Sequence, residues 1–203
     1  MKPRRKPAAL RKPDTFAAEN VLAGYSGPRL LALGREFEQF HLVGCDLSEL
    51  NLAGVRFEDC LFERCNITNA RLGGTALQNV AFADCKLLGL NFGACQDMLF
   101  GVHFDLCQLR YSSFAGKRMA ATRFGQCNLT EVDFTNADLN NVTFASCDLT
   151  QTIFHNTQLV GTDFTTATQF SLDPEANNLT GARFALAGLP GLLDNYGLVV
   201  EEG

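Results

Sequence analysis

The 203-residue sequence predicts an all-β solenoid, a tightly wound tube of short strands around a dry interior. Two periodicities support this. An apolar residue stands at every fifth position from Phe37 to Phe92 and, after a shift of two residues, from Leu99 to Phe164, which makes 26 positions. A period of five fits neither a helix nor a single strand, so the chain must turn after each group of five. A small or medium residue often stands two positions earlier and gives a second inward side chain.

The second periodicity is a coil of four such groups. Phenylalanines recur every 20 residues, or 22 across the shift, and we expect them to stack along the axis at the β-ladder spacing of about 4.8 Å. Cysteines at the same period should fill the interior as free thiols. The predicted core stack is Phe62, Phe82, Phe104, Phe124, Phe144, Phe164 and Phe184. The cysteine column is Cys45, Cys65, Cys85, Cys107, Cys127 and Cys147.

The repeats resemble those of the pentapeptide-repeat proteins, whose pattern is A(D/N)LxX. Near-ideal copies are NADLN at 136–140, SCDLT at 146–150 and QCNLT at 126–130, and the resemblance covers residues 37–187. It implies a right-handed quadrilateral β-helix with four pentapeptides per coil. The layout and the C-terminal segment resemble the branch that confers quinolone resistance or immunity to topoisomerase poisons.

The chain divides into three parts. Residues 1–36 lack the repeat and should form a basic tail followed by an N-terminal cap over 15–36 that includes a short helix. Residues 37–187 are the predicted β-helix, interrupted by a small bulge at 93–98 and by an irregular coil at 165–178. Residues 188–203 form a capping and dimerisation segment, because end coils need a cover.

That last segment is apolar. Pro190 suits the first turn of a short helix, Gly197 suits its end, and a short strand follows. An exposed apolar end favours an isologous dimer, which the resemblance also implies, over a monomeric cap. The predicted interface is Leu189, Leu192, Leu193, Tyr196, Leu198, Val199 and Val200.

The sequence offers little chemistry. It contains no phosphate-binding or hydrolase motif, and its cysteines follow the repeat rather than a zinc spacing. We therefore expect no enzyme activity, cofactor or metal. Lys117 stands at an inward position, and we expect it to turn outward near Arg110, Arg118 and Arg123. The direction of Cys95, at the shift, stays open.

Charge is the feature that bears on function. Residues 1–36 carry a net +5 and residues 37–203 a net −10. A rod of roughly 36–40 Å would match a length of B-DNA that carries ~22 charges. The net −10 of residues 37–203 is about half of that number, so the shape of the rod would matter as much as its charge in imitating DNA. The alternative for each outward acid is capping of the local backbone. Candidate partner-binding acids are Glu131, Asp133, Asp138, Asp148 and Asp163.

The resemblance implies a cytoplasmic, homodimeric DNA mimic that binds DNA gyrase or topoisomerase IV in the DNA-binding saddle of the A-type subunit. Whether it protects against quinolones or peptide toxins, or only inhibits, stays open, because the larger loops of the plasmid-borne members are missing. One alternative is a structural scaffold for an unrelated protein partner. A nucleic-acid binder that uses Lys2 to Lys12 is disfavoured by the acidic body, and no apolar run is long enough for a membrane span.

Overall fold

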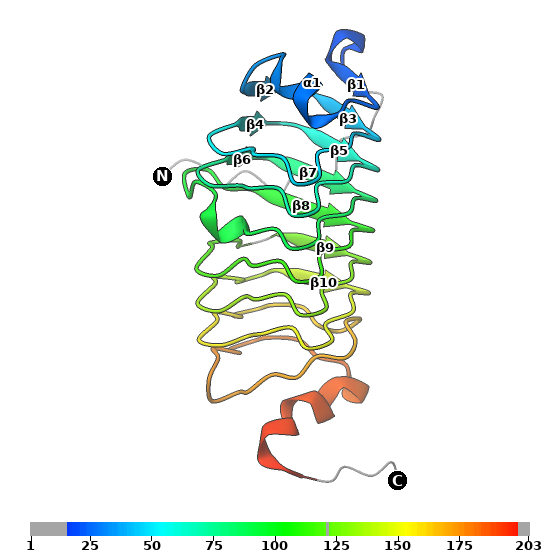
Figure 1. Ribbon diagram of the computed structural model, residues 1–203. Coiled ribbons are helices and arrows are strands. Elements are labelled where there is room, and N and C mark those ends of the chain that lie inside the picture. Colours follow the sequence, from blue (N-terminus) through cyan, green and yellow to red (C-terminus); the bar gives the residue numbers. More distant parts are fainter. Residues whose placement is uncertain (1–15, 121, 199–203) are drawn as a thin grey trace.

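The computed structural model describes residues 16–120 and 122–198, which form a rod of stacked coils (Figure 1). The fold is the predicted right-handed β-solenoid. Strands 20 to 22 residues apart pair in parallel: Leu42 lies opposite Phe62, and Phe82 opposite Phe104. One face of the rod is a seven-stranded sheet, and the adjacent face is a three-stranded sheet, β2 (Glu36–Glu38), β4 (Arg56–Glu58) and β6 (Ala76–Gln78). The strands of the larger sheet are β1 (Val21–Ala23), β3 (His41–Val43), β5 (Leu61–Glu63), β7 (Val80–Ala83), β8 (Val102–Asp105), β9 (Arg123–Gly125) and β10 (Thr143–Ala145).

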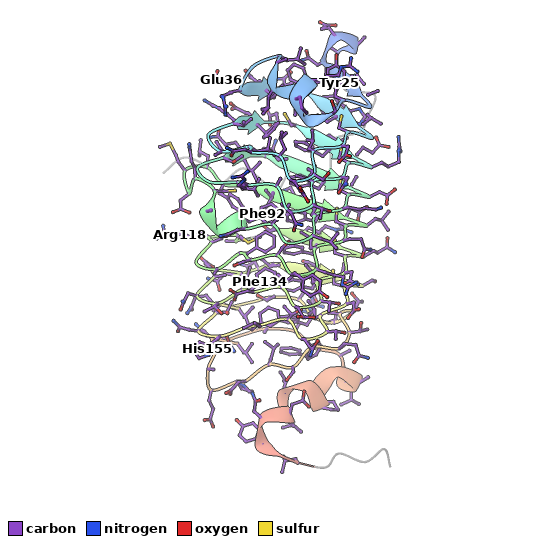
Figure 2. All side chains as sticks on the ribbon, in the orientation of Figure 1. Tyr25, Glu36, Phe92, Arg118, Phe134 and His155 are labelled. Atoms are coloured by element: carbon purple, nitrogen blue, oxygen red, sulfur yellow. The ribbon has the colours of Figure 1, made fainter. Side chains whose placement is uncertain are left out.

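The predicted core is confirmed with one exception. All of the 26 apolar positions except Leu99 are buried. The seven predicted phenylalanines stack with ring centroids 5.0–5.3 Å apart along the axis. A second stack on the opposite face contacts the first edge-on, as between Phe124 and Phe134 at 5.9 Å. Figure 2 shows Phe92 and Phe134 of this second stack inside the rod.

Most corners of the coil lie two residues after a core residue and have a left-handed backbone. Asn136 and Asn141 both have φ 58°, and Gly161 has φ 67°. Glycine and asparagine adopt this conformation at little cost, which explains their frequency there. These corners turn the chain after each group of five.

The small inward residues do more than fill space. The Cys65 thiol donates to the Leu42 carbonyl at 3.3 Å, and the Thr162 hydroxyl donates to the Leu139 carbonyl at 2.8 Å, in each case across to the preceding coil. All eight cysteines are buried and unbridged, Cys95 included. Burial raises the pKa of the Cys95 thiol to about 12, so it is a poor nucleophile at neutral pH.

The sheet extends into the segment expected to be a cap. β1 pairs with β3, and a short 3-10 helix η2 (Ala18–Asn20) precedes it, while α1 (Gly27–Leu31) follows it. Leu22 is buried one coil before Leu42. At the two five-residue steps between Leu22 and Phe37 the sequence has Gly27 and Ala32 instead of a large apolar side chain. A Cβ on Gly27 would lie 2.7 Å from Leu50 Cδ1, so a larger side chain at this position would require the Leu50 side chain to move.

The C-terminal segment differs from the expectation at its start. It forms two 3-10 helices, η4 (Leu186–Leu192) and η5 (Asp194–Tyr196), and Pro190 lies inside η4 rather than in its first turn. Gly188 lets η4 approach the Phe170 ring, and the Leu172 amide donates to the Gly191 carbonyl at 2.8 Å. Gly197 ends η5 with φ 62°, as expected. Val199 and Val200 lie outside the described residues.

The expectation that Lys117 turns outward is wrong. Its side chain is 2% exposed, and Nζ donates to the Cys95 carbonyl at 2.5 Å and to Asp97 Oδ1 at 2.6 Å. The extra residues follow η3 (Phe92–Ala94) and turn Leu99, which the period placed inside, out to solvent at 72% exposure. The Lys117 stem fills interior space, and its ammonium holds the insertion through a backbone carbonyl.

Replacing Phe124 by alanine should lower the free energy of unfolding by about 3–5 kcal/mol, because it removes a buried ring from the middle of its stack together with the edge-on contacts of that ring to the second stack. Chemical denaturation measures this. The matched control is Phe184→Ala, at the half-buried end of the stack, for which we expect a smaller loss. Equal losses at the two positions would contradict a stack that is tightest at its centre.

Lys117→Met should cost about 1.5–3 kcal/mol, because the buried Cys95 carbonyl loses its charged donor. Arg118→Met is the control, since Arg118 is the next residue in the chain and its side chain is exposed. Thermal unfolding of both variants checks this, and a Lys117→Met variant as stable as the parent would show that the ammonium does not stabilise the insertion.

Candidate protein-binding surface

Most pentapeptides expose three positions, the residue before the core residue, the one after it and the corner, although His41, Leu61, Ala76 and Ala81 are buried. Figure 2 shows Glu36, Arg118 and His155 projecting from the rod at such positions. The described residues carry 19 acidic and 11 basic side chains, a formal charge of −8. The surface is therefore acidic on average, and its function depends on where the acids gather.

The aspartates before the core residues have a structural duty. Asp133 Oδ1 accepts from the Thr135 amide at 2.8 Å, and Asp148 Oδ1 accepts from the Thr150 amide at 3.0 Å. Asp138 and Asp163 make the same contact two residues on. These bonds satisfy turn amides that the ladder leaves open. They are the backbone caps that the sequence left as the alternative to partner contacts.

Hydrogen bonds from the Thr165 hydroxyl and amide hold the pKa of Asp163 below its usual range, and Arg183 adds to this effect. The Asp163 carboxylate therefore stays charged at neutral pH. Its Oδ2 lies 3.2 Å from Arg183 Nη1, so part of its charge is neutralised on the surface.

The structure does not bring the five candidate acids together. Asp133, Asp138, Asp148 and Asp163 lie in four different ladders, one on each face of the rod, and Glu131 is at a corner. Their ladder neighbours in the following coil are Ile153 for Asp133, Gln158 for Asp138, Thr168 for Asp148 and Arg183 for Asp163.

Other acids do gather in the N-terminal half of the rod, along the two lines of corners that border the seven-stranded face, where Glu38 and Glu58 belong to β2 and β4 of the adjacent three-stranded sheet. On one edge, Glu38 pairs directly with Glu58 in the next coil, and Asp59 is the corner that follows. On the other edge, Glu63 and Asp105 lie one coil either side of Ala83, which Asp84 follows. We call these two rows the acidic edges: Glu38, Glu58, Asp59, Glu63, Asp84 and Asp105.

Two arginines neutralise part of the negative charge of the acidic edges. Arg56 Nη2 lies 2.5 Å from Glu58 Oε2, and Arg64 pairs with Glu63. Glu63 also contacts Nε2 of the buried His41 at 2.8 Å. Among the described residues, Glu38, Asp84 and Asp105 take part in no ion pair. These three carboxylates are available to a partner.

The repeat, the ladder and the inward positions together identify the family. A family model described as a pentapeptide repeat region matches residues 35–98 and 97–164. The chain belongs to the pentapeptide-repeat family. No curated protein sequence matches this pentapeptide-repeat chain significantly.

Solved structures share the fold. A trypsin-treated variant of QnrB1, a plasmid-mediated fluoroquinolone resistance protein, is 14% identical, with a TM-score of 0.65 over 90% of this chain and 89% of that one. A second trypsin-treated QnrB1 variant is 15% identical, with a TM-score of 0.61 over 89% of this chain and 97% of that one. At such identity these likenesses concern the fold.

Two kinds of site are not found in the part of the chain that the structure describes. It contains no group of three or more histidine, cysteine, aspartate or glutamate side chains placed to hold a metal ion. None of its helices has the length and apolarity of a membrane span.

Sequence reasoning missed the acidic edges because it chose acids by the repeat pattern. The signal was present: Glu38 and Glu58 are 20 residues apart, and Glu63, Asp84 and Asp105 follow at intervals of 21. The coil period of 20 residues, or 22 across the shift, aligns Glu38 with Glu58 and Glu63 with Asp105, and Asp84 lies one position beyond the residue between the last two.

Asp148→Asn should leave stability nearly unchanged, because the amide oxygen still accepts from the Thr150 amide. Asp148→Ala should lower it by about 0.5–1.5 kcal/mol, since that amide loses its partner. Denaturant unfolding of the pair separates acceptor from charge. Equal destabilisation by both substitutions would mean that the charge itself stabilises the turn.

Proposed function

We propose that the protein binds a bacterial type II topoisomerase, DNA gyrase or topoisomerase IV, in the DNA-binding saddle of the A-type subunit, as a mimic of duplex DNA. The observation that carries the proposal is the pair of acidic edges on a rigid rod. Its fold is shared with QnrB1, a plasmid-mediated fluoroquinolone resistance protein. A groove that holds two phosphate backbones is basic and suits two parallel acidic rows.

The charge density is of the right order locally. From Glu38 to Asp105 the acidic edges span three coil spacings, about 14 Å, a length over which B-DNA carries about eight phosphates. The edges supply six carboxylates, two of them paired with arginine.

We also propose a homodimer through the C-terminal end. Leu189, Tyr196 and Leu198 are 40%, 47% and 60% exposed, and Leu186 beside them is 84% exposed. Leu192 and Leu193 are half-buried under them. Apolar side chains this exposed at one end of a rod suit a second copy of the same end. The dimer would double the length available to a DNA groove.

A scaffold that binds an unrelated protein is the second candidate. The acidic edges end at Asp105, and the corresponding positions of the next coil are Gly125 and Gln126. The acidic edges are thus confined to one half of the rod, which suits a local protein contact as well as a long DNA groove.

A gyrase supercoiling assay and a direct binding measurement test the proposal. We expect the protein to inhibit supercoiling, and the variant Glu38→Gln/Glu58→Gln/Asp84→Asn/Asp105→Asn to bind at least tenfold more weakly. The control removes the same charge from the four faces: Asp133→Asn/Asp138→Asn/Asp148→Asn/Asp163→Asn, which keeps the turn caps. It should bind nearly as the parent does.

Three other results would relocate the contact or refute part of the proposal. A control that loses more affinity than the edge variant would return the contact to the scattered aspartates. No binding at low salt, no inhibition and no rescue from a poison would refute the topoisomerase proposal. A parent that binds with no dependence on either set of charges would refute the DNA mimicry.

A further inference from the structure

One coil in the middle of the rod has unusual corners. Among the described residues with a left-handed backbone, the only aliphatic or aromatic side chains are Leu99, Leu106 and Tyr111, with φ 58°, 56° and 63°. All the other such corners carry glycine or a polar side chain. A bulky residue with positive φ is strained, and strain of this kind gathers at functional sites.

Leu106 and Tyr111 bound one face of this coil. They are consecutive corners, 49% and 51% exposed, so their side chains lie at the surface and contribute little to the core. At the same corners of the neighbouring coils stand Asp84 and Gln126 beside Leu106, and Gly89 and Glu131 beside Tyr111. The apolar corners therefore belong to this coil alone.

Two cations lie on this face, Arg110 between the two corners and Lys86 one coil earlier. Lys86 pairs with Gln108 in the ladder, and Arg110 lies against Tyr111, with Cζ 5.2 Å from the ring centroid and Nη2 2.9 Å from the hydroxyl. Neither cation forms an ion pair among the described residues. Arg110 Nε is buried and lacks a hydrogen-bond partner within the described chain, a defect that an incoming carboxylate could relieve by drawing the guanidinium outward.

We propose that Leu106, Tyr111, Lys86 and Arg110 form a docking face for a protein segment that carries a carboxylate between apolar side chains. We call it the mid-rod face. The two cations select the carboxylate, and the strained corners provide apolar anchors at the spacing of one side of the coil. Asp84 and Glu131 at its borders repel a polyphosphate chain, so the occupant is a peptide rather than a nucleic acid. The proposal does not depend on topoisomerase binding.

Selection from a phage-displayed library of random 12-residue peptides on the full-length protein tests this. We expect enriched peptides to contain Asp or Glu flanked by apolar residues. The best peptide should bind at least tenfold more weakly to Leu106→Asn/Tyr111→Asn and to Lys86→Gln/Arg110→Gln. Ile153→Thr, which removes an exposed apolar residue from another face, should bind it within twofold of the parent.

Stability provides the second readout. Asparagine accepts a left-handed backbone, so Leu106→Asn and Tyr111→Asn should each raise the melting temperature by about 2–4 °C while they weaken binding of the peptide. Any of four results would overturn the proposal: no enriched peptide, enriched peptides without acids, equal affinity for the Leu106→Asn/Tyr111→Asn variant, or a melting temperature lowered by either substitution. Tight binding of a labelled 20-nucleotide single strand, lost in Lys86→Gln/Arg110→Gln, would also overturn it in favour of nucleic acid.

Discussion

The structure depends on one match of lengths. Parallel strands pair at 4.7–4.9 Å, and stacked aromatic rings lie slightly farther apart. Strand pairing and ring stacking can therefore both form only if each ring lies over the ring one coil earlier. The observed centroid distances of 5.0–5.3 Å meet this condition along the whole stack from Phe62 to Phe184. Coil length, corner position and the burial of small residues all follow from keeping that register.

The sequence predicted what this register imposes. The phenylalanine stack, the cysteine column and the coil length were readable because every departure would leave a void or an unpaired ladder. The burial of Lys117 could not be predicted from hydropathy, because its stem is apolar while its ammonium donates to the Cys95 carbonyl. Leu99 was predicted inside because the apolar period gives no sign that the extra residues turn its side chain to solvent. The first coil escaped notice because Gly27 interrupts the apolar period where Leu50 occupies the space.

The surface was harder to predict, for a physical reason. Outward positions carry two kinds of acid: aspartates such as Asp148, which the turn requires, and acids such as Asp84 and Asp105, which no backbone bond explains. Only the second kind is free to report on a partner, and composition cannot separate the two. The same division applies to the corners, where glycine and asparagine serve the turn while Leu106 and Tyr111 work against it.

The insertion held by Lys117 shows how such a rod can change over evolutionary time. Each coil contacts only its neighbours, and the ladder resumes its register directly after the extra residues, with Phe104 opposite Phe82. A corner can therefore accept new residues with one compensating change, an interior side chain that ties the enlarged corner to the core. Variation in such chains should accordingly accumulate as lengthened corners paired with a single new interior anchor, which makes corners the natural place to graft a recognition loop by design.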